Sequence, residues 1–369
     1  MKKRVLLGMS GGVDSSVSAI ILKEQGYEVI GATMKLWEDK NNPEVESGCC
    51  SFSAVNDAKR VCDQLGIPHY TLNCEDEFKT HVIDNFINCY KNAGTPNPCV
   101  ECNKYLKFGA FYRKALELEC DYIATGHYAK TEFSDKYNQY VLKMSDEKAK
   151  DQSYFLYGIP KEVLPKMLFP LKNMSSKEDV RKIARENNLQ VADKKDSQEI
   201  CFIPDNDYGK FLEQNLEKLP PKGDIVLEGS NEILGKHKGV IYYTIGQRKG
   251  LGIAYKEPLY VIKLDSKNNK VIVGTESQLY NNTLKANKVN ILLNIDLDKP
   301  INVKAKIRYR SKPAEAVLEM DNKNIATLNF KEPQRAITNG QSVVFYIDEN
   351  IVLGLSLIHI SEPTRRTPI

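Results

Sequence analysis

Short apolar runs alternate with helical repeats along the first 130 residues. The run RVLLGM stops at Ser10-Gly11-Gly12, and apolar residues then recur at helical spacing until Gly26. Strands and helices that alternate at this spacing predict an α/β fold with a doubly wound parallel sheet. The pattern predicts strands at 4–9, 27–34, 69–74 and 122–129, and helices at 14–26 and 53–65.

The pattern changes after about residue 203. A turn-rich stretch follows, and from about residue 258 short alternating segments such as KVIVGT and SVVFYI dominate. They favour a small β-rich central domain and a C-terminal β-barrel. We expect no strand partner for the last stretch, LSLIHISEPTRRTPI, and interpret it as a sequencing or cloning artefact. The predicted domains are therefore 1–203, 204–280 and 281–355, followed by an anomalous tail at 356–369.

Composition excludes several classes of protein. Hydrophobic residues make up 41% and charged residues 27%, which excludes collagen, a long coiled coil and wholesale disorder. The net charge of +4 is too small to predict a nucleic-acid partner by itself. No apolar run approaches the roughly 20 residues of a membrane span, and the start lacks a secretory signal. We expect a cytoplasmic protein without a membrane partner, and nine cysteines are too few for a disulfide scaffold.

The motif SGGVDSS (10–16) directly follows a predicted strand and opens a predicted helix. Its glycines let the backbone approach a ligand closely. Backbone N–H groups and the hydroxyls of Ser10, Ser15 and Ser16 can then hold phosphate at the helix N-terminus. The spacing is neither GxxxxGK[ST] nor GxGxxG. It resembles the pyrophosphate loop of the PP-loop ATP pyrophosphatases, which cleave ATP between its α and β phosphates.

Cysteines form the second group with candidate chemistry. Cys99 and Cys102 form a CxxC motif in a loop rich in proline and glycine, where Lys104 and Lys107 would favour the thiolate. Two thiols that meet can exchange sulfur through a disulfide. The spacing alone leaves a zinc site and a redox site equally open.

Basic residues alternate along VKAKIRYRSK (303–312). If this segment is a strand, one face carries only cations and the other carries apolar residues and a tyrosine. We interpret that face as a track for RNA phosphates rather than as a guarded sheet edge. The cations are Lys304, Lys306, Arg308, Arg310 and Lys312.

Motifs spread over the chain to about Gly354 resemble those of the bacterial tRNA-specific 2-thiouridylases. They are GMSGGVDSSV, MKLW, GCCS, LGIPHY, GTPNPC–CNK–KFG, ATGHYA, KDQSYFL, KKDSQEICFIP and YYTIGQRKGLGI, in the expected order. The resemblance implies an N-terminal PP-loop domain of the adenine nucleotide alpha-hydrolase type. It also implies an enzyme that puts sulfur on C2 of the wobble uridine of lysine, glutamate and glutamine tRNAs. Such an enzyme uses ATP with Mg²⁺ and a persulfide donor, either a cysteine desulfurase or a sulfur-relay protein.

The same resemblance implies roles for single residues. Cys102 matches the nucleophile, and Cys201 matches the cysteine that carries the persulfide. The positions that match the ATP site are Gly8, Met9, Ser10, Gly11, Gly12, Val13, Asp14, Ser15, Met34 and Gly126. The positions that match tRNA contacts are Asn97, Pro98, Cys99, His127, Lys150, Asp151, Gln152, Arg308, Tyr309 and Gln341.

The implied chemistry begins with adenylation of the uracil O2, which releases pyrophosphate and makes C2 electrophilic. Cys201 then delivers sulfur, and Cys102 resolves the persulfide. Some family members carry an acid/base aspartate where this chain has Cys99, so another group must take that role here. Cys99, Cys102 and Cys201 could instead hold a [4Fe–4S] cluster, which we rank behind the persulfide relay.

Other functions remain alternatives at this stage. An amide-forming PP-loop ligase would need an ammonia-supplying domain, which this length does not accommodate. A nucleotide-regulated RNA-binding protein would bind tRNA but release no pyrophosphate. A redox or zinc protein would be identified by bound metal.

Overall fold

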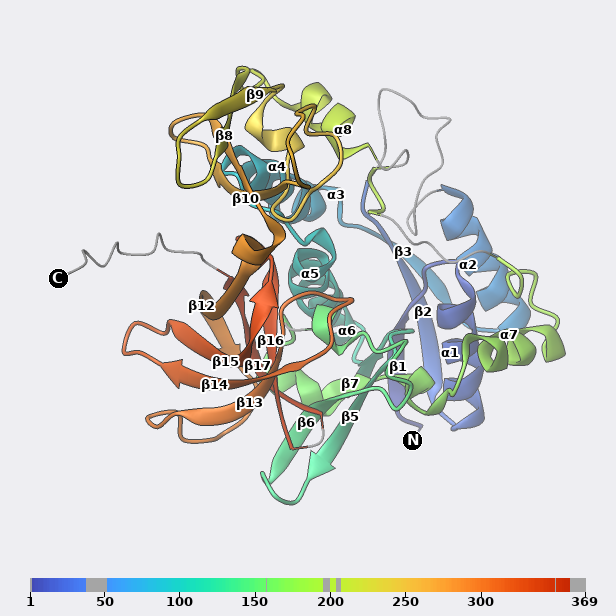
Figure 1. Cartoon of the computed structure of the whole chain (residues 1–369). Helices are drawn as coiled ribbons and strands as arrows, with labels where there is room; N and C mark the ends of the chain where they lie inside the picture. Colours follow the sequence, from blue (N-terminus) through green and yellow to red (C-terminus); the bar gives the residue numbers. More distant parts are fainter. Residues whose placement is uncertain are drawn as a thin grey trace. The chain divides into compact units, whose positions relative to one another are not determined.

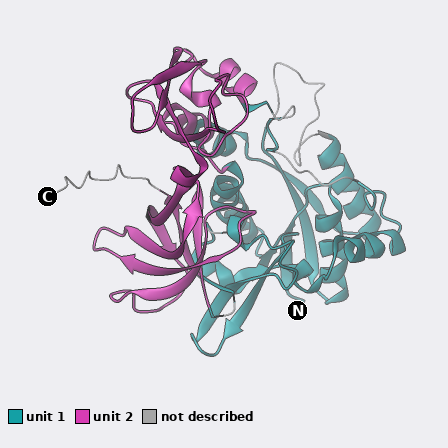
Figure 2. Ribbon diagram, in the orientation of Figure 1, with its two compact units in different colours: residues 1–85, 98–208, 348–352 teal, residues 86–97, 209–347, 353–369 magenta. Residues whose placement is uncertain are grey.

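The chain folds into two compact units (Figure 2). The computed structural model describes residues 2–37, 52–156, 158–194, 200–203, 207–348 and 350–358. Unit 1 comprises residues 1–85, 98–208 and 348–352, and unit 2 comprises residues 86–97, 209–347 and 353–369. The three sequence-based domain boundaries stay a prediction. No helix in the described ranges is long and apolar enough to cross a lipid bilayer.

A parallel five-stranded sheet organises unit 1, in the order β3-β2-β1-β4-β7. The predicted doubly wound sheet is confirmed, with register pairs such as Leu6↔Ile30 and Leu6↔Ile123. Apolar runs form its central strands because both faces are covered. Its strands are β1 (Arg4–Gly8), β2 (Glu28–Lys35), β3 (His69–Asn73), β4 (Tyr122–Ala124) and β7 (Met167–Leu168).

Helices cover both faces of this sheet (Figure 1). One face holds α1 (Val13–Glu24), α2 (Phe52–Leu65) and α7 (Lys177–Glu186). Val5 and Leu7 of β1 share a buried cluster with Val17, Ala58 and Val180 from these helices. The other face holds the helices that carry the CxxC motif. They are α5 (Pro98–Glu101), the π-helix η2 (Cys102–Ala110) and α6 (Phe111–Glu117).

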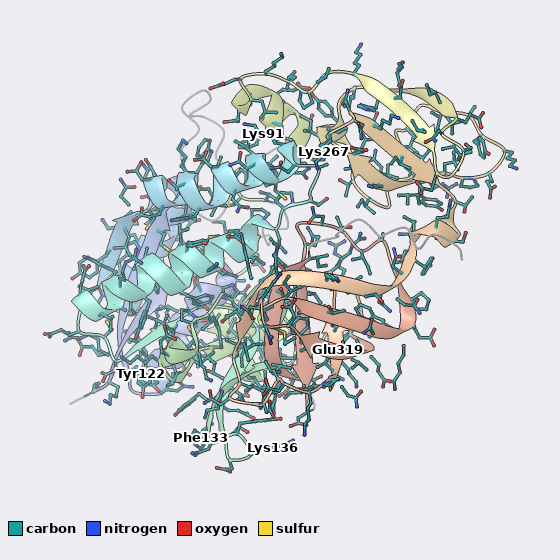
Figure 3. All side chains as sticks on the ribbon, turned by 90° about the vertical axis from the view of Figure 1, so that its left-hand side faces the viewer. Lys91, Tyr122, Phe133, Lys136, Lys267 and Glu319 are labelled. Atoms are coloured by element: carbon teal, nitrogen blue, oxygen red, sulfur yellow. The ribbon has the colours of Figure 1, made fainter. Side chains whose placement is uncertain are left out.

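Shorter elements complete unit 1. A hairpin of β5 (Ala129–Ser134) and β6 (Gln139–Met144) carries Phe133 and Lys136 near its tip (Figure 3). Lys136 and Tyr137 both donate hydrogen bonds to Asp348, which anchors the hairpin. The remaining helices are α3 (Glu75–Phe78), η1 (Lys79–Ile83), α4 (Asp84–Lys91, which continues into unit 2), η3 (Ser153–Phe155), η4 (Lys161–Lys166) and η5 (Pro170–Asn173).

Unit 2 contains a four-stranded sheet in the order β10-β11-β8-β9, in which β8 and β11 are parallel. The helix α8 (Tyr208–Asn215) precedes it, in a region where the sequence showed no strong helical period. The other elements are β8 (Gly223–Leu227), β9 (Ile233–His237), η6 (Val240–Tyr242), β10 (Tyr260–Asp265), β11 (Lys270–Gly274) and η7 (Glu276–Leu279).

The predicted C-terminal barrel is confirmed and closed. Its strands follow the order β12-β15-β14-β13-β16-β17, and β12 pairs with β17 to complete the ring. Alternating apolar residues face inward, as in β14, where Ala316 and Leu318 are buried. The strands are β12 (Tyr280–Ile291), β13 (Ile301–Lys306), β14 (Ala314–Met320), β15 (Ala326–Arg335), β16 (Ser342–Ile347) and β17 (Ile351–Ile358).

The strand β17 corrects one expectation. We expected no strand partner from residue 355 onward, yet Leu355 pairs with Asn290 and Ile358 pairs with Ala286. The apolar run continues through this stretch, so its side chains fill the barrel; Leu355 and Ile358 are 0% and 1% exposed. The residues after 358, including both prolines of the tail, lie outside the described residues.

Candidate active site

The SGGVDSS loop begins at the carboxyl end of β1, where the strand order reverses. In the sheet, β1 lies between β2 and β4, so the connections leave this point in opposite directions. Open α/β sheets bind ligands at such a switch point. The predicted strand–loop–helix is confirmed, with Gly8 ending β1 and Val13 opening α1. Met34, near the end of the neighbouring β2, is 8% exposed.

Glycine is required at two places around this loop. Gly11 has φ +67°, and a Cβ there would lie 2.3 Å from the carbonyl oxygen of Ala54. At Gly126, which follows β4, a Cβ would lie 3.0 Å from the backbone N of Ser15. The absent side chains let α2 and the end of β4 approach the loop closely. Gly126 therefore borders the candidate ATP loop, and its contact with the nucleotide, which the resemblance implied, stays a prediction.

The serine hydroxyls of the loop have internal partners. The Ser15 and Ser16 hydroxyls donate to the Gly12 carbonyl oxygen at 3.0 Å and 2.9 Å. Both residues are buried, 3% and 0% exposed, so these hydroxyls tighten the first turn of α1 instead of pointing outward. Ser10 N also donates to Ser15 Oγ at 3.2 Å, so the phosphate ligands that stay predicted are the remaining backbone N–H groups at the start of α1.

Two lysines that the sequence analysis did not identify reach the SGGVDSS loop. The Asp14 carboxylate accepts hydrogen bonds from the Tyr128 hydroxyl at 2.8 Å and from Lys177 Nζ at 2.7 Å. Lys194 Nζ donates to the Gly11 carbonyl oxygen at 3.1 Å and to Asp57 at 2.6 Å. Both lysines lie more than 160 residues further along the chain. Lys177 lies in none of the motifs named above, and Lys194 is the first residue of KKDSQEICFIP, for which the resemblance implied a role only at Cys201. Only the fold brings these cations to a loop suited to phosphate.

Helix α3 packs against the segments that bear Cys102 and Cys201. Cys99 is exposed on α5, and Cys102, which begins η2, and Cys201 are partly exposed. Cys201 lies in a turn anchored by Phe202, whose ring packs edge-on against Phe78 of α3 at 5.7 Å. Helix α3 also contacts η2. Unit 1 thus brings the two segments that bear Cys102 and Cys201 onto α3.

A π-helix carries Cys102, and a buried asparagine anchors it. Asn103 is 2% exposed, and its Nδ2 donates to the Phe155 carbonyl oxygen at 2.8 Å. Among the described residues its Oδ1 has no hydrogen-bond partner. A buried acceptor without a partner costs about 1–3 kcal/mol. π-Helices are rare and occur frequently at functional sites.

His127 is held between two partners after β4. Its Nδ1 lies 2.8 Å from Thr125 Oγ1, and its Nε2 lies 3.4 Å from Lys107 Nζ. Desolvation, and then the Lys107 ammonium, hold the pKa of His127 well below its ordinary value, so the ring is neutral. We expected Lys104 and Lys107 to favour a cysteine thiolate. Lys107 instead faces His127, and Lys104 Nζ lies over the Tyr105 ring at 4.7 Å.

The residues of the predicted tRNA-contacting stretch Lys150-Asp151-Gln152 differ in how far they are buried. Asp151 is 1% exposed, and its carboxylate accepts hydrogen bonds from Ser145 N, Ser153 N and the Ser153 hydroxyl. Gln152 Oε1 accepts from Tyr128 N at 3.0 Å. These two side chains hold the loop internally, which argues against a direct tRNA contact by Asp151. Lys150 is partly exposed.

The geometry does not fit a metal cluster. In the described ranges, no three histidine, cysteine, aspartate or glutamate side chains gather as a metal site. Cys99, Cys102 and Cys201 all lie in those ranges, so they do not form the thiolate set that a [4Fe–4S] cluster needs. Cys49 and Cys50, weighed as a further thiol site, lie outside the described residues.

Three other cysteines belong to the core. Burial raises the pKa of Cys62 to about 12 and that of Cys74 and Cys120 to about 11. Such thiols stay protonated at neutral pH and are poor nucleophiles.

In unit 2, the predicted basic strand is wrong beyond Lys306. Strand β13 ends there, and the next residues form a turn in which Ser311 Oγ donates to the Arg308 carbonyl oxygen at 2.9 Å. Lys306 is 6% exposed and its ammonium lies over the Tyr309 ring at 5.4 Å. The turn breaks the alternation, so the five cations do not share one strand face. Lys304 also lies opposite Glu315 in the register of β13 and β14.

The remaining predicted tRNA residues of unit 2 have partners within it. Arg308 Nη2 donates to the Ala336 carbonyl oxygen at 2.6 Å and to Thr338 Oγ1 at 2.8 Å. Gln341 Nε2 donates to the carbonyl oxygens of Thr95 and Pro96 at 2.9 Å and 3.2 Å. Asn97 is the next residue after Pro96, and Pro98 opens α5.

Comparison with known proteins covers nearly the whole chain. Residues 3–205 match the family described as tRNA methyl transferase HUP domain. Residues 209–275 match the tRNA methyl transferase PRC-barrel domain, and residues 281–358 match the aminomethyltransferase beta-barrel domain. Among solved structures, a 4-thiouridine synthetase–RNA complex with bound ATP is 18% identical, with a TM-score of 0.35, over 57% of this chain and 50% of that chain.

Curated relatives are similar along their full length. The tRNA-specific 2-thiouridylase MnmA of Clostridioides difficile (strain 630) is 49% identical, over 98% of this chain and 99% of the relative. The protein of the same name from Acetivibrio thermocellus is 51% identical over 97% and 99%. That from Clostridium beijerinckii is 51% identical over 96% and 98%.

Proposed function

The chain belongs to the family of tRNA-specific 2-thiouridylases, and on that premise we propose that it transfers sulfur to C2 of the wobble uridine of tRNA at the expense of ATP. The observation that carries the proposal is the full-length match at about half identity. The SGGVDSS loop at the switch point of the sheet supports the ATP step. A cytoplasmic location fits this substrate.

Adenylation is the first proposed step. The uracil O2 attacks the α-phosphate of ATP, the bond to the β-phosphate breaks, and pyrophosphate leaves. Mg²⁺ bound together with ATP would offset the charge of the departing pyrophosphate. Backbone N–H groups at the start of α1 bind the phosphates, and Lys177 and Lys194 contribute positive charge beside them. The adenylated C2 becomes electrophilic because AMP is a good leaving group.

Sulfur transfer is the second proposed step. Cys201 carries a persulfide supplied by a cysteine desulfurase or a sulfur-relay protein. The Cys102 thiolate attacks the inner sulfur, which forms a Cys102–Cys201 disulfide and releases hydrosulfide. Hydrosulfide attacks C2, AMP leaves, and an external thiol reductant restores both cysteines. The partial exposure of both cysteines supports this role, in contrast to the buried core thiols.

Anaerobic thiolation tests the proposal. The protein is incubated with unmodified lysine tRNA, Mg-ATP and a persulfide source, and nucleosides are analysed by mass spectrometry. We expect 2-thiouridine with the native chain and none with Cys201→Ser, which should still release pyrophosphate. Cys120→Ala, at a buried thiol, is the matched control and should retain thiolation.

Two results would contradict the proposal. Tight tRNA binding without pyrophosphate release would indicate a nucleotide-regulated RNA-binding protein instead. Thiolation that survives Cys201→Ser would exclude Cys201 as the persulfide carrier.

A further inference from the structure

A turn of the barrel holds the segment that leads to the CxxC motif. The turn Asn339-Gly340-Gln341 lies between β15 and β16, in unit 2. The Asn339 carbonyl oxygen accepts a hydrogen bond from Thr95 N at 2.9 Å. The Gln341 side-chain amide donates to the carbonyl oxygens of Thr95 and Pro96. Both N–H bonds of that amide are thereby used.

Close packing reinforces these hydrogen bonds. Gly340 has φ +87°, and a Cβ there would lie 2.7 Å from Cys89 Sγ and 3.0 Å from the Thr95 carbonyl oxygen. A Cβ at Gly94 would also lie 2.7 Å from Cys89 Sγ. Only residues without side chains fit at both positions, so the 94–96 segment and the barrel turn have little freedom to shift.

The last barrel strand fixes the turn from its other side. Ile358 N donates to the Gln341 carbonyl oxygen at 2.8 Å, and Gly340 N donates to the Ile358 carbonyl oxygen at 3.2 Å. The next residue, Ser342, is fully buried at the start of β16. Gln341 is therefore held by its backbone while its side chain holds Thr95 and Pro96.

We propose that Gln341 is a positioning residue, whose amide fixes the backbone that enters the Asn97–Cys99 segment and thereby the path to Cys102. The inference rests on the proposed function, in which Asn97–Cys99 meets the target base. Asn97 directly follows the held residues in the chain, and only four residues separate it from Cys102. This role uses both amide N–H groups of Gln341, so that a tRNA contact by this side chain would fall to its Oε1.

Gln341→Met tests this role, because methionine keeps the length of the side chain but removes its donors. The matched control is Gln334→Met, since Gln334 Nε2 donates within its own strand, to the Glu332 carbonyl oxygen. Each variant is compared with the native chain for tRNA affinity, single-turnover thiolation, and amide hydrogen exchange of residues 94–99. For Gln341→Met we expect tRNA affinity within about twofold, thiolation slower by about tenfold or more, and faster exchange at Thr95 N. Gln334→Met should match the native chain in all three.

Two outcomes would overturn the proposal. One is a loss of tRNA affinity equal to the loss of thiolation rate, which would make Gln341 a tRNA contact. The other is unchanged exchange at Thr95 in a folded Gln341→Met variant. If the native chain itself forms no 2-thiouridine, the proposed function fails. The exchange comparison, made without tRNA, would still decide whether Gln341 holds this segment.

Discussion

His127 is the clearest case of a single residue whose properties follow from its neighbours. Thr125 and Lys107 lie on either side of the ring, and the low pKa of His127 arises from desolvation and from the Lys107 charge. A neutral ring has one N–H donor and one unprotonated acceptor nitrogen, so His127 can donate one hydrogen bond and accept another.

The first prediction concerns the titration of His127. With isotopically labelled histidine, NMR should show that the pKa of His127 lies well below the ordinary histidine value of about 6.5. Lys107→Met removes the second cause and should raise the pKa of His127 toward that value. The chain has only five histidines, so His127→Gln suffices to assign the signal.

The sign of the linked stability effect follows from the same shift. Below about pH 6.5 the unfolded chain binds a proton at this site that the folded chain resists. Stability should therefore fall as the pH drops below that value, and His127→Gln should reduce the fall. Titration of His127 near its ordinary pKa in the native chain would refute the assigned environment.

At the scale of elements, the contact between the end of β4 and the start of α1 shapes the candidate ATP loop. Gly126→Ala would place a Cβ 3.0 Å from Ser15 N and 3.0 Å from the Asp14 carbonyl carbon. Backbone atoms cannot rotate away, so the first turn of α1 must shift. We expect ATP affinity to fall by about tenfold, at an overpacking cost of about 1–3 kcal/mol. Calorimetric titration with ATP measures both affinities. The control is Gly109→Ala, whose Cβ would lie 3.4 Å from its nearest neighbour, the Lys104 carbonyl oxygen, and which should leave ATP affinity unchanged. Equal affinities for both variants would show that this close approach does not shape the site.

How far the sequence predicts these elements depends on how local their causes are. The β1–loop–α1 unit was predicted because its apolar run, its glycines and its helical repeat are contiguous. The turn after Lys306 was not predicted, because the alternation of basic and apolar residues favoured a strand. The Arg308–Ser311 hydrogen bonds that close the turn leave no periodic signal in the sequence. Lys177 and Lys194 reach the loop only through the packing of distant segments, and the motif that begins at Lys194 does not itself indicate that its side chain meets this loop.

At the scale of the whole molecule, the two units are built from interleaved stretches of sequence. Residues 86–97 belong to unit 2 although unit 1 surrounds them in the chain, and β17 begins in unit 1 and ends in unit 2. Its residues from Gly354 onward pair with β12 and close the barrel, and Ile358 holds the turn that contains Gln341. A change at the end of the chain can therefore reach the segment that precedes Cys99.

Truncation tests this dependence. A chain that ends at Gly354 loses Leu355 and Ile358, which are almost fully buried, together with their pairing to β12. Burying one such side chain contributes about 1.5–3 kcal/mol, so we expect a loss of about 3–6 kcal/mol in the free energy of unfolding of unit 2. A chain that ends at Ile358 keeps every one of these contacts and is the matched control. Urea unfolding, monitored by hydrogen exchange of amides in unit 2, measures the difference in free energy.

The shorter chain also loses the Ile358–Gln341 hydrogen bond. Exchange at Thr95 should therefore accelerate in the shorter chain and not in the control. Equal unfolding midpoints for the two chains would mean that the β12–β17 pairing does not stabilise the barrel, and the coupling of the barrel to Thr95 would then lose its basis.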